Sequence, residues 1–393
     1  MTGECAMGEQ CRLGGRPAGV SVGVAGTAKN TGKTTTLMGA MRECQERGRL
    51  VRVTSIGFDG EDVDNVTGLP KPRIYCDRGT LFATARGCVK AGSARVRLLA
   101  GTSIETALGQ VVVGVVEREG LVVLAGPNKT PDLQSLLQII EEVDRRPGVT
   151  LVDGAFGRMA PMSILDAIVL ATGAARNPSI DLLVSETRDM VQVFDIPRAP
   201  AGVAGVEQSC GEFRLRGGRT EVLPEAGLLG PVKPPAGREC VEYLDIPGAV
   251  FPPALAALAE ALGPRLRAAH VVLSSPASLL VSGDPPAAAR AVAQLRSFGA
   301  RVWVRRRPRL LGITVNPYYP VRVSAGNYEP RFVDALEMMR SFRKDVARPV
   351  WDIVREGAGG LGETLESMMN RVESEGKEGT LNEYPLCRDN VDW

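Results

Sequence analysis

Hydrophobic and polar positions alternate along the first two-thirds of the chain in a pattern that predicts strands and helices in turn. Short apolar runs typical of buried strands occupy residues 20–25, 50–57, 111–116, 121–125, 149–152, 167–171 and 181–184. Segments with helical spacing lie between them, at 33–47, 103–110 and 131–145. Such alternation is typical of a parallel sheet with helices on both faces, so we predict an α/β fold.

The composition changes after residue 196. Gly, Pro and Arg dominate residues 197–237, which predicts a linker with irregular structure or a short hairpin. A second α/β pattern follows, with helices at 252–262, 285–298 and 330–343, a strand at 269–273 and a strand pair joined near Pro308. The predicted organisation is a flexible amino terminus (1–17), a first domain (18–196), the linker (197–237), a smaller α/β domain (238–355) and a flexible, weakly packed tail (356–393).

Composition and charge exclude several classes of partner. The 393 residues are 44% hydrophobic, enough to bury a large core, and the net charge is +2. This balance favours neither nucleic acid nor an anionic membrane surface. No apolar run approaches the ~20 residues that span a bilayer, and residues 1–19 lack the apolar core of a signal peptide. We therefore expect a cytoplasmic protein.

The cysteine and histidine content limits which disulfides and metal sites we expect. The eight cysteines form no C-x-x-C pair, which favours reduced thiols over a disulfide framework. The single histidine, His270, lies in an apolar run, and we interpret it as a strand or core residue. One histidine excludes His-rich zinc sites and iron sites with two histidine ligands.

Residues 26–36, GTAKNTGKTTT, resemble a phosphate-binding loop with one extra residue. The common pattern is G-x-x-x-x-G-K-[ST], whereas five residues separate Gly26 from Gly32 here. An apolar strand precedes the loop and a helical pattern follows, so the positive end of the helix would face an anion. The predicted nucleotide-binding residues are Gly26, Thr27, Ala28, Lys29, Asn30, Thr31, Gly32, Lys33, Thr34 and Thr35.

Acidic residues at strand ends are the candidates for holding Mg²⁺. Ligands of open parallel sheets bind beyond the carboxyl ends of the strands. One predicted strand leads to Asp59, and another ends at Asp153, followed by glycine as in a Walker B segment. With the hydroxyl of Thr34, these two acids would satisfy Mg²⁺. We predict catalytic roles for Lys33 and Asp153.

Other charged segments have less specific interpretations. Asp62 and Asp64 fit a solvated acidic turn. Residues 128–132, NKTPD, resemble the guanine-reading N-K-x-D motif, but the aspartate falls one position late, and Asp132 is better read as the first acid of a helix. Residues 305–309, RRRPR, could hold phosphate or RNA, but no aromatic platform accompanies them and the overall charge is nearly balanced, so a solvated strand edge is the preferred interpretation.

The nine-residue spacing of residues 26–34 is similar to the phosphate loop of dethiobiotin synthetase, a P-loop family whose members often dimerise. This resemblance implies binding roles for Gly26, Gly32, Lys33 and Thr34, a place for Asp153 on a glycine-rich turn, and a possible homodimer. The other signatures of that family are not evident. Lys29 lies four residues before Lys33, and the signature lysine of the deviant Walker class lies five before, which argues against a trans-acting role.

Four segments together resemble a more specific family, the P-loop subunit of the reactivase for adenosylcobalamin-dependent lysine 5,6-aminomutase. They are GTAKNTGKTTT, TSIGFDGED, LPKPRI and LVDGAFGR, and ITVNPYYP extends the resemblance to about residue 345. The resemblance implies an ATP- and Mg²⁺-dependent accessory protein. Its partners would be the aminomutase and a MutS-like ATPase subunit, with which it would exchange damaged cobalamin for intact cofactor.

Two other functions remain open from the sequence. The chain could be a stand-alone ATP-dependent ligase or kinase in which Lys71, Arg73 and Arg158 bind a carboxylate or phosphate. It could also be a nucleotide-binding scaffold without turnover. The sequence does not distinguish ATP from GTP.

Overall fold

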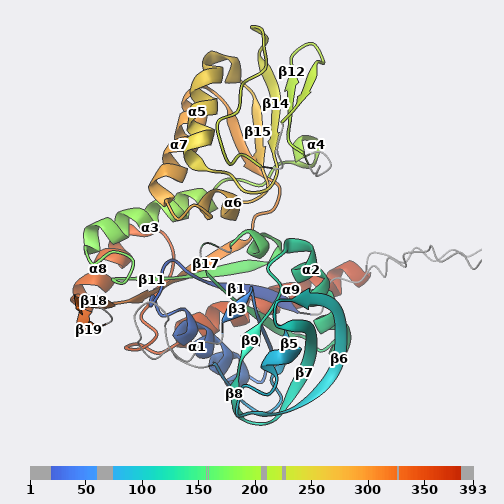
Figure 1. Cartoon of the computed structure of the whole chain (residues 1–393), viewed down its shortest axis with the longest axis vertical. Coiled ribbons are helices and arrows are strands. Elements are labelled where there is room, and N and C mark those ends of the chain that lie inside the picture. The colour runs from blue at the N-terminus through green and yellow to red at the C-terminus, as the bar shows by residue number, and fades with distance from the viewer. Residues whose placement is uncertain are drawn as a thin grey trace, which may run out of the picture.

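The fold is mixed α/β, built on a large, mostly parallel sheet (Figure 1). The computed structural model describes residues 19–59, 74–155, 157, 159–204, 210–223, 227–324 and 327–381. The large sheet has nine strands in the order β20-β17-β11-β1-β10-β2-β5-β7-β6. Strands from β20 to β5 are parallel to their neighbours, and β7 and β6 continue the sheet antiparallel.

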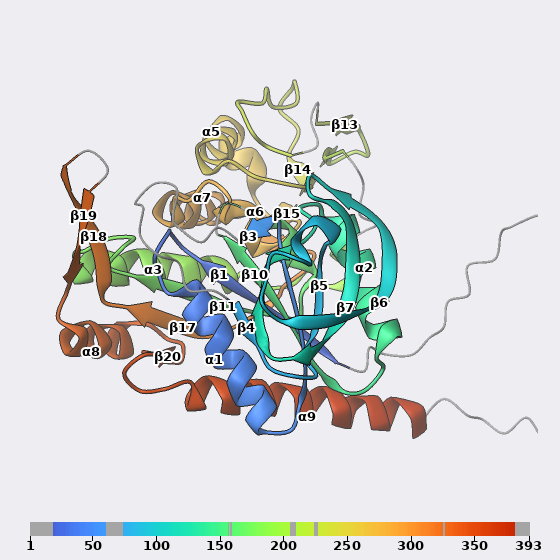
Figure 2. The same cartoon turned by 60° about the horizontal axis from the view of Figure 1, so that its bottom comes forward.

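The strands of this sheet have the following bounds: β1 (Val20–Gly26), β2 (Leu50–Ser55), β5 (Leu81–Ala85), β6 (Arg95–Thr106), β7 (Gly109–Arg118), β10 (Gly148–Ala155), β11 (Ala167–Gly173), β17 (Arg309–Asn316) and β20 (Val350–Trp351). The central strands are mostly apolar and are buried along most of their length because helices cover both faces. Helices α1 (Lys33–Glu46) and α9 (Gly359–Leu381) pack on one face (Figure 2). On the other lie α2 (Thr130–Val143) and α3 (Ile180–Phe194).

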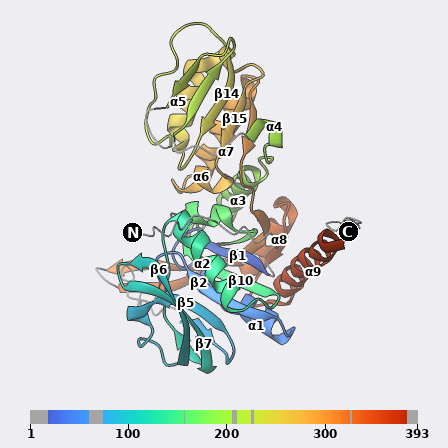
Figure 3. The same cartoon turned by 90° about the vertical axis from the view of Figure 1, so that its right-hand side faces the viewer.

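A second sheet of five strands, in the order β13-β12-β14-β15-β16, lies beyond α3 (Figure 3). Residues 197–237, predicted as a linker with irregular structure or a short hairpin, contain the hairpin of β12 (Glu212–Leu215) and β13 (Thr220–Val222), which belongs to this sheet. The parallel strands are β14 (Val241–Ile246), β15 (His270–Leu273) and β16 (Arg301–Val304), accompanied by α4 (Ala201–Ala204), α5 (Pro252–Leu262), α6 (Pro276–Leu280) and α7 (Pro285–Ser297). One apolar cluster runs from the large sheet through α3 into the second sheet, so α3 is packed between them.

After the second sheet the chain returns to the first. Strands β17 and β20 both join the large sheet, separated by the hairpin of β18 (Tyr318–Ser324) and β19 (Asn327–Phe332) and by α8 (Ala335–Asp345). The two strands around Pro308 therefore belong to different sheets. The predicted second segment, 238–355, differs from the structure for this reason: hydrophobic periodicity identifies a strand and does not say which sheet it joins.

Smaller elements complete the structure. Two-stranded sheets pair β3 (Phe58–Asp59) with β9 (Leu124–Ala125), and β4 (Ile74–Cys76) with β8 (Gly120–Val122). Short 3-10 helices occupy Arg86–Cys88, Ala160–Ile164 and Gly263–Leu266.

Three predicted elements are wrong, each for a local reason. Residues 103–110, predicted as a helix, form the ends and turn of the β6–β7 hairpin, where Gly109 takes a φ of 95°. Residues 181–184, predicted as a strand, open α3, whose buried side chains recur with helical spacing. The segment predicted as a weakly packed tail contains α9, which buries Leu361, Leu365 and Met368 against the large sheet.

Candidate functional site

The glycine-rich loop connects β1 to α1 at the carboxyl end of the large sheet. Gly26 ends β1 and Gly32 precedes α1 with a φ of 85°, the left-handed region that favours glycine. A Cβ on Gly26 would lie 3.2 Å from the Cβ of Lys33, so a side chain there would crowd the start of the helix. The order of strand, glycine loop and helix predicted for residues 20–47 is confirmed.

Lys33 and Asp153, for which the sequence predicted catalytic roles, lie together. The Nζ atom of Lys33 is 3.1 Å from Oδ2 of Asp153. Asp153 aligns with Val24 in the parallel pairing of β10 with β1, so the helix that follows β1 begins above the carboxylate. The Asp153 side chain is completely buried, whereas that of Lys33 is 18% exposed. The lysine can therefore contact solvent and the acid at once.

A Mg²⁺ ion fits part of the predicted donor set. Among the described residues, no three His, Cys, Asp or Glu side chains form a metal-binding group. Mg²⁺ commonly uses one or two carboxylates together with phosphate and water oxygens. Thr34, in the first turn of α1, and Asp153 supply a hydroxyl and a carboxylate at the same end of the sheet. The backbone of Asp59 pairs with Leu124, but its side chain lies outside the described residues.

The loop is held by hydrogen bonds that the sequence did not predict. Thr27 donates from its backbone N–H to the carbonyl of Ala171 at 2.9 Å, and its hydroxyl bonds that of Thr172 at 2.9 Å. From the far side, Nδ2 of Asn316 donates to the carbonyl of Asn30 at 2.9 Å. Asn30 has a φ of 63°, so this bond helps to hold a backbone conformation that is unusual for a residue other than glycine.

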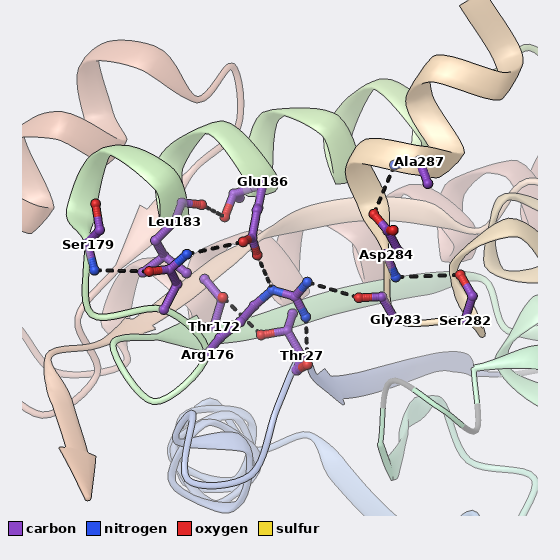
Figure 4. Close-up of polar contacts among 12 residues, drawn as sticks. Thr27, Thr172, Arg176, Ser179, Leu183, Glu186, Ser282, Gly283, Asp284 and Ala287 are labelled. Carbon is purple, nitrogen blue, oxygen red and sulfur yellow. Dashed lines mark hydrogen bonds and ion pairs between the residues drawn. The ribbon is translucent and has the colours of Figure 1, made fainter. Parts of the chain in front are cut away.

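Arg176, which the sequence analysis did not identify, contacts both the glycine loop and α3. Its Nη1 donates to the carbonyl of Thr27 at 3.0 Å, and its Nε donates to Glu186 of α3 at 2.6 Å (Figure 4). The sequence signal was weak: a glycine turn, GAARN, after an apolar run. The rule that ligands bind beyond strand ends points to this turn after β11 and to Asn316 at the end of β17.

Other predicted residues are spread over the molecule. Asp132 lies in the first turn of α2, as interpreted. His270 is confirmed as a residue of β15, where its Nδ1 accepts a hydrogen bond from Trp303 Nε1 at 3.0 Å. Arg305 corrects the interpretation of RRRPR as solvated, because its side chain is buried against Asp245. The following candidates lie outside the described residues: Asp62, Asp64, Lys71, Arg73 and Arg158.

The cysteines in the described part of the chain are free thiols, as predicted. Burial raises the pKa of Cys44 and of Cys76 to about 12. Both thiols therefore stay protonated at neutral pH and pack as small apolar side chains.

Comparison with models of known protein families and with curated protein sequences finds no match. Within the described ranges, no helix combines the length and the apolar character needed to cross a membrane.

Proposed function

We propose that this chain is a P-loop protein that binds ATP with Mg²⁺ at the loop between β1 and α1. In the cell it would serve in the cytoplasm as the nucleotide-dependent subunit of a reactivase for an adenosylcobalamin-dependent lysine 5,6-aminomutase. The observation that carries the nucleotide proposal is the 3.1 Å contact of Lys33 with buried Asp153 beside a glycine loop at a helix N-terminus. The reactivase proposal rests on the sequence resemblance.

Different groups of the proposed site would bind the phosphates and the metal ion. Backbone N–H groups of the loop and of the first turn of α1 would surround the phosphates, and the helix dipole favours their charge. Lys33, partly exposed, would turn its ammonium from Asp153 toward the outer phosphates. Mg²⁺, when bound, would neutralise phosphate charge, and Thr34 and Asp153 are the residues that would hold it or its waters.

Asp153 would also orient the attacking water. Its carboxylate is buried near the carboxyl end of β10, where bulk solvent would not compete for a hydrogen bond from that water. Slow turnover follows if a partner must complete the site. Binding and hydrolysis can then shift a protein between two states only through contacts that differ between the states.

The decisive experiment measures Mg²⁺-dependent hydrolysis of ATP and GTP by the full chain, alone and with the aminomutase and its MutS-like ATPase partner. Hydrolysis should be slow alone, rise with the partners and fall about 100-fold in Lys33→Ala, because one charge-stabilising donor is lost. The matched control is Lys90→Ala, which removes an exposed lysine in the segment after β5 and should leave the rate unchanged.

Two results would contradict the proposal in different ways. Absence of nucleotide binding by a folded chain would refute the nucleotide site itself. Fast turnover without any partner would refute the reactivase and favour a ligase or kinase that acts alone. Thermal denaturation followed by circular dichroism would establish that each variant is folded.

A further inference from the structure

The Arg176 side chain connects three elements that are distant in sequence. Besides Thr27 and Glu186, its guanidinium donates through Nη2 to the carbonyl of Gly283 at 3.1 Å (Figure 4). The side chain is only 13% exposed. A guanidinium is planar and presents its donors in a fixed fork, so its three acceptors are held in one relative arrangement.

One acceptor belongs to the glycine loop. The peptide bond between Thr27 and Ala28 is planar and trans, so fixing the Thr27 carbonyl toward Arg176 points the Ala28 N–H in the opposite direction. Arg176 therefore sets the orientation of one of the loop amides proposed to face phosphate. A change in the loop that rotates this peptide would also pull on the guanidinium.

Another acceptor belongs to the turn that begins α7. Gly283 has a φ of 77°, and the next residue, Asp284, caps the helix by accepting the N–H of Ala287 at 2.9 Å. Helix α7 packs on α5 and against the second sheet. A displacement of the Gly283 carbonyl is thus a displacement of the start of a helix that belongs to the second sheet.

The third acceptor, Glu186, lies on α3, between the two sheets. Its other oxygen accepts Asn177 Nδ2 at 3.2 Å, and Asn177 Oδ1 accepts the N–H of Ser179 just before α3. The turn after β11 is therefore braced against α3, and α3 packs against α7. Because Glu186 and the turn are held in this way, the Arg176 guanidinium can transmit a movement of the loop to the turn at Gly283, and the reverse.

We propose that Arg176 is a positioning residue that couples nucleotide occupancy of the loop to the turn 281–284 and so to the second sheet. This inference rests on the proposed nucleotide site. When phosphate occupies the loop, the Thr27 carbonyl and its arginine are held more firmly, and the turn before α7 is stabilised with them. By linkage, a ligand or protein that stabilises this turn raises nucleotide affinity by the same factor.

Hydrogen exchange of the full chain tests this coupling, with nucleotide affinity measured separately by calorimetry. Saturating MgATP should slow exchange of the amides within residues 281–287 roughly tenfold in the unaltered protein, since a hydrogen bond to a charged group is stabilised. These are the amides of 281–284 and of Ala287, because residues 285 and 286 are prolines. Arg176→Met should still bind MgATP at higher concentration and should show no slowing in 281–287. Arg188→Met, on the exposed face of α3, is the matched control and should behave like the unaltered protein.

The possible failures are distinguishable. If the unaltered chain binds no nucleotide, the proposed site and this inference both fall. If it binds and residues 281–287 do not respond, or respond equally in Arg176→Met, the coupling alone is refuted. Should Arg176→Met not fold, Arg176→Lys retains the charge but not the three-way fork, and an undiminished response in that variant would equally refute the coupling.

Discussion

The nine-stranded sheet and the five-stranded sheet each contain a buried aspartate near the carboxyl end of a parallel strand. The two acids differ in how exposed their cationic partners are. In the large sheet Asp153 contacts Lys33 at 3.1 Å, with the lysine side chain 18% exposed. In the second sheet Asp245 contacts Arg305 at 2.5 Å, and the arginine side chain is 6% exposed. The first pair is open on one side, and the second is closed.

The elements that supply the two cations explain this difference. Lys33 follows a glycine loop and is the first residue of α1, and its side chain is partly exposed. Arg305 follows a buried strand and also donates to the hydroxyl of Tyr243 at 3.1 Å, while Arg214 covers the tyrosine ring at 5.1 Å. In the proposed site, the partly exposed lysine of the open pair is the cation that would contact a ligand, whereas the arginine of the closed pair is buried.

The largest expected effect comes from breaking the closed pair. Arg305→Met leaves Asp245 buried without its arginine and should lower the free energy of unfolding by about 3–5 kcal/mol. The affinity for MgATP should change little, because Arg305 pairs with Asp245, whereas the proposed coupling to the glycine loop runs through Arg176 and the turn 281–284. Urea denaturation followed by circular dichroism, together with calorimetric titration of MgATP, measures both.

The double variant Arg305→Met/Asp245→Leu is the control for this prediction. Replacing a buried ion pair by apolar side chains is often neutral or stabilising, so most of the lost stability should return. A single variant as stable as the parent protein would show that the pair at Asp245 is no more constrained than the one at Asp153.

An intermediate effect is expected at the open pair's own loop. Asn316→Ala removes the hydrogen bond to the Asn30 carbonyl and should weaken MgATP binding roughly five- to tenfold, the equivalent of about 1 kcal/mol. Overall stability should change little. Asn128→Ala, in the exposed turn before α2, is the matched control and should leave the affinity unaltered. If Asn128→Ala weakened MgATP binding more than Asn316→Ala, the role assigned here to Asn316 would belong to the segment 128–132.

The smallest effect concerns Tyr243 at high pH. Burial, followed by the charge of Asp245, raises the pKa of this phenol above 10. Because the folded pKa exceeds the unfolded one, the stabilisation is present below pH 10 and is lost as pH rises through the folded pKa. Tyr243→Phe should cost about 1 kcal/mol at neutral pH through the lost hydrogen bond and should reduce the alkaline loss.

Urea midpoints of the parent and of Tyr243→Phe across the alkaline range would test this prediction. Burial raises the pKa values of Cys44 and Cys76 to about 12, so these thiols also lower the stability of both proteins at alkaline pH. Only the difference between the two curves is therefore informative. Parallel curves would mean that Tyr243 titrates normally and that its site is more open than its contacts indicate.

The sequence predicted individual helices and strands more accurately than it predicted how they pack together. Strand β1 and helix α5 have bounds close to the predicted ones, because apolar runs and proline or glycine boundaries are local signals. The hairpin at 103–110 and the start of α3 were misread, since a short apolar run fits either a strand or a buried helix. Helix α9 was missed because its polar composition hides the one apolar stripe that contacts the large sheet.

By itself the sequence determined the glycine loop, the lysine and threonine that follow it, and the acid at the end of β10, because each lies in a continuous local motif. Only the tertiary structure decided that β17 returns to the large sheet, and that Asn316 and Arg176 hold the loop. Arg176 lies 149 residues from Thr27 and 107 from Gly283. Such contacts depend on which strands become neighbours, and hydrophobic periodicity contains no information about that order.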